Sequence, residues 1–94
     1  MFSWDEAKNA VNKKKHGVSF EGASLVFDDP FHVSRLERIE NDEARWQTIG
    51  RAGGLLLLLV AHTWEEAETG DLHIRIISAR RANKVERTIY EEGA

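Results

Sequence analysis

Residues 72–87 read LHIRIISARRANKVER, and they decide the expected fold because the pattern of a strand changes into that of a helix within them. Strong β-formers occupy every second position up to Ala79, so one strand face is apolar while the other carries His73 and Arg75. Beyond Ala79, apolar residues recur at helical spacing, at Ala82, Val85 and Ile89. The stretch therefore predicts a strand that leads straight into a helix beginning near Arg80.

Cations gather at the same junction. Arg80, Lys84 and Arg87 share the side of the expected helix opposite its apolar stripe, and Arg75 projects from the strand beside Arg80. Because a helix start offers free backbone N–H groups and a positive dipole end, a phosphate there would meet the dipole and a guanidinium together. An ordinary solvated helix face carries cations too, and that alternative stays open.

The charges of each sign lie in separate segments. Residues 8–16 contain lysines and His16 without any acid, and in residues 72–90 Glu86 is the one acid among several cations. The acids gather instead at 37–43 and 65–71, in expected loops. A formal net charge of -3 argues against unspecific nucleic-acid binding, but convergence of the basic segments would form a local positive cleft for a polyanion.

Composition narrows the class of protein. The 94 residues are expected to form a single domain, 1–94, and the absence of cysteine excludes disulfides and thiolate chemistry. The four histidines lack the spacing of a helical metal site, so neither a metal nor another cofactor is expected. The N-terminus does not resemble a signal peptide, and the apolar run 55–61 is far shorter than the ~20 residues that cross a bilayer. A cytoplasmic location without membrane contact is therefore expected.

Two helices are predicted before the strands. Asp5 suits the N-cap of a helix over 6–15, with Ala7, Ala10 and Val11 as its buried stripe, and Gly17 suits the left-handed position that ends it. Ser19 suits the start of a second helix that reaches Phe27 and stops at Asp28-Asp29-Pro30.

A meander of strands should follow. Strands are expected near 31–38, 44–50 and 55–62, ahead of 72–79, with short connections that favour antiparallel pairing. The apolar run Leu55–Ala61 predicts a central strand buried on both faces. The expected fold is α+β, in two layers, with a mainly antiparallel sheet, N-terminal helices and a C-terminal helix. Trp46 and Trp64 are expected to pack against the core or its rim, with base stacking as the alternative.

Motifs in order along nearly the whole chain resemble one family. They are FxWD at 2–5, KHGVSFE at 15–21, VFxD at 26–29, ExR at 43–45, and IISAR at 76–80 followed by Ala82, Glu86, Arg87 and Tyr90. Together they resemble the BrnT family of bacterial type II toxins. The resemblance implies a RelE-like fold, ribonuclease activity that arrests growth, and a neutralising antitoxin of the BrnA type through which the complex binds promoter DNA.

The residues offer the chemistry that RNA cleavage needs without a metal. Such cleavage requires a base for the 2′-hydroxyl proton, an acid for the leaving oxygen, and cations for the charge on phosphorus. The predicted catalytic residues are Arg75, Arg80, His16 and Glu86, and the predicted RNA contacts are Lys15, Arg45, Lys84, Arg87 and Tyr90. Tyr90 lies four residues after Glu86, so the two are expected to act on one site.

Structural alternatives accompany these assignments. His16 has a role as a helix terminator, Glu86 as the partner of an arginine, and Arg45 as a structural residue. At the level of the whole chain, the alternative to a ribonuclease toxin is a non-catalytic module that holds an acidic segment of a partner protein in the same cleft. A stand-alone nucleic-acid binder is disfavoured by the net charge.

Overall fold

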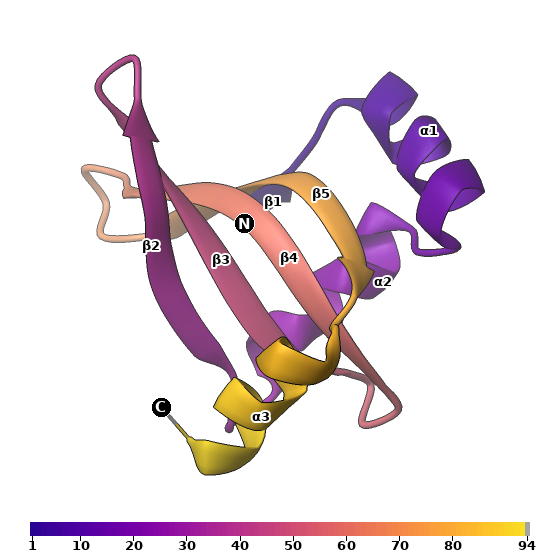
Figure 1. Cartoon of the computed structure of the whole chain (residues 1–94). Helices are drawn as coiled ribbons and strands as arrows, with labels where there is room; N and C mark the ends of the chain where they lie inside the picture. The colour runs from indigo at the N-terminus through magenta and orange to yellow at the C-terminus, as the bar shows by residue number, and fades with distance from the viewer. Residues whose placement is uncertain (94) are drawn as a thin grey trace.

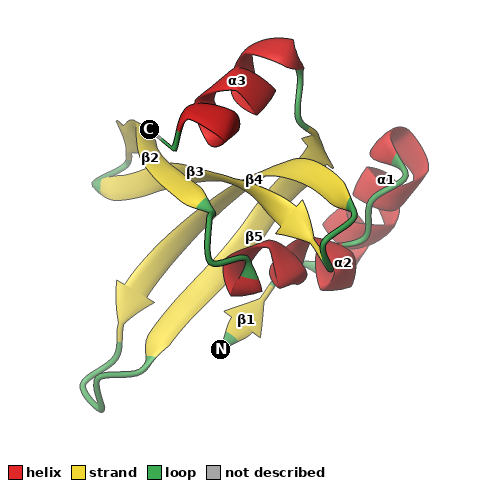
Figure 2. Cartoon of the chain, turned by 90° about the horizontal axis from the view of Figure 1, so that it is seen from below, coloured by secondary structure: helices red, strands yellow, loops and turns green. Residues whose placement is uncertain are grey.

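The computed structural model describes residues 1–93, in which helices pack on both faces of a five-stranded sheet (Figures 1 and 2). The elements are β1 (Phe2–Ser3), α1 (Glu6–His16), α2 (Phe20–Ser24), the 3-10 helix η1 (Leu25–Asp28), β2 (Val33–Glu40), β3 (Glu43–Ala52), β4 (Leu56–Glu66), β5 (Leu72–Arg81) and α3 (Lys84–Glu92). The strand order is β1-β5-β4-β3-β2, antiparallel except that β1 runs parallel to β5. The mainly antiparallel α+β prediction is confirmed. No helix in residues 1–93 is long and apolar enough to span a membrane.

The two N-terminal helices begin and end where local chemistry predicts. The Asp5 carboxylate accepts hydrogen bonds from the backbone N–H groups of Ala7 and Lys8, and Gly17 ends α1 in the left-handed conformation. The Ser19 hydroxyl accepts from the N–H of Gly22 at 3.0 Å. The second helix is shorter than expected, because α2 gives way to the tighter turn of η1 after Ser24.

The predicted apolar stripe of α1 is wrong. Its buried residues are Asn9 and Asn12, whereas Val11 is exposed. The Asn12 amide donates to the carbonyls of Val18 and Ala79 at 2.9 and 2.8 Å and accepts from the N–H of Ala79 at 3.2 Å. Since β1 pairs only with the earlier part of β5, Asn12 satisfies backbone groups that this edge would otherwise leave unpaired.

Two apolar clusters lie on opposite faces of the sheet. On the face covered by α2 and η1, here the α2 face, the buried residues are Val18, Phe20, Ala23, Val26, Leu58, Val60, Ile74, Ile76 and Ala79. On the other, the α3 face, Ile49, Leu57 and Leu59 pack against Ala82, Ile89 and Tyr90. The central strand predicted from the leucine run is thus confirmed over Leu57–Val60, although Leu55 lies in the turn before it. The two-layer prediction is wrong, because α3 packs on the face opposite α2 (Figure 2).

A bulge in β5 decides where its side chains point. Ala61 pairs with Ser78 but His62 pairs with Ile76, so Ile77 is an extra residue in the strand. The bulge keeps Ile76 and Ala79 on the α2 face, and it places Arg75, Ser78 and Arg80 together on the α3 face.

The C-terminal helix starts later than predicted. Arg80 and Arg81 still belong to β5, and Asn83 caps α3 by accepting from the N–H of Glu86 while the Glu86 carboxylate accepts from the N–H of Asn83. This reciprocal pair fixes the helix start at Lys84. Val85 is exposed, because the helix turns Glu86, Ile89 and Tyr90 toward the sheet instead.

Candidate functional site

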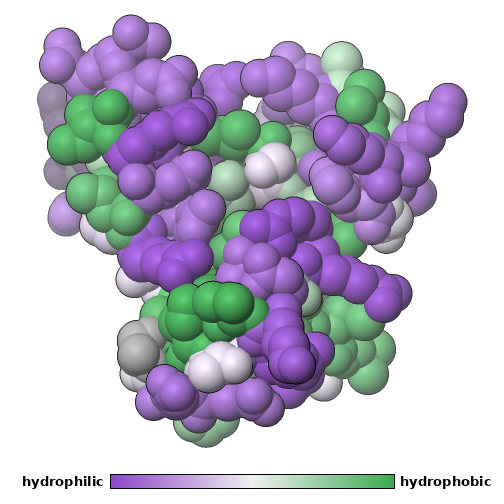
Figure 3. All heavy atoms as spheres, in the orientation of Figure 1, coloured by the Kyte–Doolittle hydropathy of each residue, from purple (hydrophilic) through white to green (hydrophobic). Residues whose placement is uncertain are grey.

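The part of the α3 face that α3 leaves open carries a group of arginines. Arg35 pairs with Gln47, Gln47 with Ala61, and Ala61 with Ser78, so one row of residues crosses four strands. The alternation of side chains and the bulges in β2 and β5 place five arginines around this row. The surface that they form is here called the arginine face, and its members are Arg35, Arg38, Arg45, Arg75 and Arg80. Figure 3 views this side of the molecule, where strongly hydrophilic side chains surround a hollow between the β2–β3 hairpin, α1 and α3.

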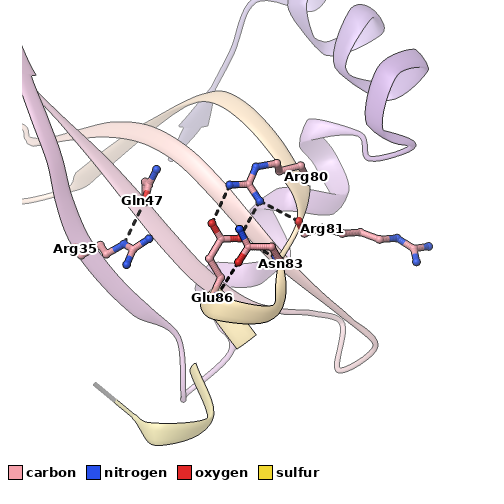
Figure 4. A network of polar contacts seen from close by, with 6 residues as sticks. All are labelled: Arg35, Gln47, Arg80, Arg81, Asn83 and Glu86. Atoms are coloured by element: carbon pink, nitrogen blue, oxygen red, sulfur yellow. Dashed lines mark hydrogen bonds and ion pairs between the residues drawn. The ribbon is translucent and has the colours of Figure 1, made fainter. Parts of the chain in front are cut away.

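Arg80 is held by a buried carboxylate. Its two terminal nitrogens donate to the two oxygens of Glu86, each at 2.8 Å, and one also donates to the carbonyl of Arg81 at 3.2 Å (Figure 4). Glu86 is 5% exposed, and its carboxylate also accepts from the N–H of Asn83 at 2.9 Å. The hydrogen bonds from Arg80 lower the pKa of Glu86, aided by the Asn83 N–H and the charge of Arg35 and opposed by burial. Glu86 is therefore an ionised partner of Arg80, which is the structural alternative that the sequence left open.

Arg35, like Arg38, is a residue of this face that sequence reasoning missed. Its Nε donates to Oε1 of Gln47 at 3.2 Å, and its charge contributes to the lowered pKa of Glu86. Arg80 is bonded to the Glu86 carboxylate, whereas Arg35, from the strand at the other side of the meander, is bonded to Gln47 and acts on that carboxylate through its charge (Figure 4). The sequence did show the alternation of charged and apolar residues in β2. It did not show which of these residues share a face with Arg80, because that depends on the register across the sheet.

Arg45 and Arg75 lie toward the far end of the same face. Arg75 pairs with Thr63, is exposed, and forms no ion pair within residues 1–93. Arg45 lies 3.6 Å from the Glu43 carboxylate, and its buried Nε has no hydrogen-bond partner in the described part of the chain. Arg75 and Arg80 are separated by five positions along β5, so they stand roughly 15 Å apart. The prediction that they lie side by side is wrong, although the bulge does turn them to one face.

A groove between α1 and β5 adjoins the arginine face. Its volume is about 500 Å³, and among its lining residues are Lys8, Lys15, His16 and Ser78. From β5 the groove is lined by Ile77 and Ser78, and Ser78 is two positions from Arg80 on the same face. The segment 8–16 thus packs against β5, although Arg80 is not among the residues that line the groove. His16 is also the last residue of α1, so both of its predicted roles fit its position.

The remaining predicted residues lie outside this centre. Lys84 and Arg87 are exposed on α3. The Tyr90 hydroxyl donates to Asp29 at 2.7 Å, and the Arg51 guanidinium lies 5.5 Å from its ring centroid. Burial and the hydrogen bond to Asp29 raise the pKa of Tyr90. Tyr90 and Glu86 are bound to different partners, so the structure does not bring the two side chains together as predicted. Residues 1–93 contain no group of three or more histidines or carboxylates arranged to hold a metal ion.

Comparison with known proteins points in one direction. The family model described as the ribonuclease toxin BrnT of type II toxin-antitoxin systems matches residues 4–86. The crystal structure of the Brucella abortus ribonuclease toxin BrnT aligns over 89% of this chain and 99% of its own, with 28% sequence identity and a TM-score of 0.60. No curated protein matches the chain significantly.

Proposed function

Because the chain belongs to the BrnT family of ribonuclease toxins of type II toxin-antitoxin systems, we propose that it cuts RNA internally at the arginine face without using a metal ion. The observation that carries this proposal is the Arg80–Glu86 pair, in which a buried carboxylate holds a guanidinium in one orientation on an open face. A donor that is already oriented needs no reorganisation when charge develops in the transition state, which is why such donors accelerate reactions.

In the proposed reaction the 2′-hydroxyl of one nucleotide attacks the adjacent phosphorus. The 5′-oxygen leaves, and the upstream product ends in a 2′,3′-cyclic phosphate. The attack increases the negative charge on the non-bridging oxygens. A guanidinium has five N–H donors, and Arg80 uses two for Glu86 and one for the Arg81 carbonyl, so donors remain for these oxygens. Arg35, which within residues 1–93 is engaged through its Nε alone, provides a second cation across the face.

His16 is assigned to take the 2′-hydroxyl proton, and the leaving 5′-oxygen takes a proton from water. An imidazole is a common general base near neutral pH, and His16 lines the groove between α1 and β5. Glu86 is assigned to positioning rather than to proton transfer, because hydrogen bonds from Arg80 and Asn83 already occupy its carboxylate.

The other cations are assigned to the RNA backbone. Arg45 and Arg75 are placed to meet phosphates at the far end of the arginine face, and Lys15 to meet one beside the groove. Lys84 and Arg87 extend the positive surface over α3. Tyr90 receives no RNA contact in this scheme, because its hydroxyl is bound to Asp29. We assign the fold to the RelE-like class, since helices from the first third pack on one face of an antiparallel meander.

RNA cleavage in the presence of a chelator tests the proposal. The purified chain should cut single-stranded RNA in EDTA and leave 2′,3′-cyclic phosphate or its hydrolysis product. Cleavage that EDTA abolishes and a divalent ion restores would show that the metal-free mechanism is wrong. A folded chain that cuts no RNA but still binds its partner would favour the non-catalytic protein-binding module.

A type II toxin has an antitoxin partner. We propose that this antitoxin is of the BrnA type, that an acidic segment of it covers the arginine face, and that the complex contacts promoter DNA through the antitoxin. The cations on that face are the reason for proposing an acidic segment, because opposite potentials across an interface favour association. The inhibition should weaken as salt is added, since salt screens exposed charges.

A further inference from the structure

The α2 face carries an uncovered apolar patch at the end of the sheet away from α2. Leu36 and Ile39 of β2 are 51% and 68% exposed, and beside them lie the half-buried rings of Trp46 and Trp64, 4.8 Å apart between centroids. Leu36 is the cross-strand partner of Trp46. These four residues are here called the tryptophan patch, and they lie on the opposite side of the sheet from the arginine face.

A second bulge creates this patch. Leu36 pairs with Trp46 but Arg38 pairs with Arg45, so Glu37 is an extra residue in β2. Without it, strict alternation would place Leu36 and Ile39 on opposite faces. The bulge therefore adds a second exposed apolar side chain to the patch and at the same time keeps Arg38 on the arginine face.

Acidic residues lie in the segments at this end of the sheet. The β2–β3 turn and the β4–β5 loop lie at the same end (Figure 1); the turn contains Asp42 and the loop Glu68, while Glu37 follows Leu36 in β2 and Glu66 ends β4, two positions after Trp64. All four acids are exposed, and none forms an ion pair within residues 1–93. This end of the molecule is thus apolar in its centre and negative at its rim.

The negative charge of the rim discriminates among the molecules that could bind to the patch. RNA is a polyanion and would be repelled. A second copy of the chain, docked by a two-fold axis, would bring two identical acidic rims together, and like charges facing each other oppose association. A segment with an apolar stripe and flanking lysines or arginines matches both the centre and the rim.

We propose that the antitoxin anchors itself by laying a basic amphipathic helix on the tryptophan patch. Its apolar stripe would cover Leu36, Ile39 and the two indole rings, and its cations would meet the acids of the rim. β2 is an edge strand, so the antitoxin chain has a path around it from the patch to the arginine face. The inference rests on the antitoxin that the family implies and is independent of the RNA chemistry proposed for the other face.

The test compares matched substitutions in the complex of the full chain with the antitoxin encoded beside it. Leu36→Thr with Ile39→Thr removes exposed apolar groups while keeping residues that favour strands. Leu55→Thr and Val85→Thr are the controls, since both residues are exposed, 80% and 68%, and lie in the β3–β4 turn and on α3. Calorimetric titration should show the double patch variant bound about tenfold or more weakly, and the controls within about twofold of wild type. RNA cleavage by the free patch variant should match that of the wild type.

Two further measurements protect the test against misfolding of that variant. Exchanging Glu66 and Glu68 for glutamine should weaken the complex at low salt and make less difference at high salt. In the wild-type complex, Trp46 and Trp64 should become shielded from a soluble fluorescence quencher. Unchanged affinity in the patch variant, indoles that stay accessible in the complex, or a free chain that dimerises through the patch would each overturn the proposal. A wild-type chain that cuts no RNA would instead count against the proposed function alone.

Discussion

Exchanging Glu86 for glutamine should destabilise the protein by about 2 kcal/mol and slow RNA cleavage at least tenfold. The substitution preserves the size of the side chain, and glutamine also completes a capping box at this helix position, so the start of α3 is retained. What is lost is the charge that receives two hydrogen bonds of 2.8 Å from Arg80. The substitution therefore isolates the ion pair from the helix cap.

The magnitude follows from the burial of the two partners. Removing one member of a fully buried ion pair costs about 3–5 kcal/mol, because the remaining charge has no partner. The Arg80 side chain is 39% exposed and regains water when Glu86 is neutral, so a value of about 2 kcal/mol is expected. The guanidinium would also lose its fixed orientation, and misplacing a catalytic group by about 1 Å costs on the order of 100-fold in rate.

Urea unfolding and single-turnover cleavage measure the two effects, with Glu91→Gln as an exposed control on the same helix. The pKa of Glu86 is lowered in the folded state, so its stabilisation is present above its ordinary pKa and is lost as the pH falls through the lowered value. The stability gap between wild type and Glu86→Gln should therefore close in acid. A stability loss with unchanged kcat would restrict Glu86 to a structural role. Unchanged stability would refute the reasoning about the buried pair.

Three further outcomes are expected. Arg75→Ala should relieve toxicity and slow RNA cleavage without changing the unfolding midpoint, because Arg75 is exposed and outside any ion pair in residues 1–93. Lys13→Ala should change little, and growth after induced expression compares the two variants. Burial lowers the pKa of His62 to about 4, so as the pH falls His62 is protonated in the unfolded state before it is protonated in the folded state. The free energy of unfolding, measured by urea titration, should therefore fall on the order of 3 kcal/mol from about pH 6.5 to about pH 4, and His62→Gln should remove this dependence. Tyr90→Phe should lose the hydrogen bond to Asp29 and about 1–2 kcal/mol of stability while cleavage stays at the wild-type rate, and slower cleavage would return Tyr90 to the site.

Arg80→Ala is a less direct probe than the sequence indicated. The sequence placed Arg80 at the junction of strand and helix, pointing away from the apolar face, where truncation would leave the fold intact. In the structure the same truncation strands the buried Glu86 carboxylate, so a loss of toxicity would combine misfolding with lost chemistry. Arg80→Lys keeps a positive charge beside Glu86 but removes the planar fork, which makes it the better test of catalysis.

The sequence by itself determined the features whose causes act within a few residues. Asp5 and Ser19 start helices because their oxygens reach the next free N–H groups, and Gly17 ends α1 because glycine adopts the left-handed conformation at little cost. The leucine run indicated a central strand because it is short, follows Gly53-Gly54, and a strand covered on both faces buries consecutive apolar residues. The motif resemblance indicated the family, which the comparisons confirmed.

Tertiary structure decided where the functional side chains meet. Strict alternation over the odd separation of Arg75 and Arg80 places them on opposite faces, and the bulge at Ile77 reverses this. A bulge is set by the register against a neighbouring strand, which single-strand patterns do not contain. In the same way the sequence leaves Glu86 as either a catalytic carboxylate or the partner of an arginine until α3 packs against β3 and β4, and the alternation in β2 does not single out Arg35 until four strands align. Local propensity decided the elements, and register and packing across the sheet decided the site.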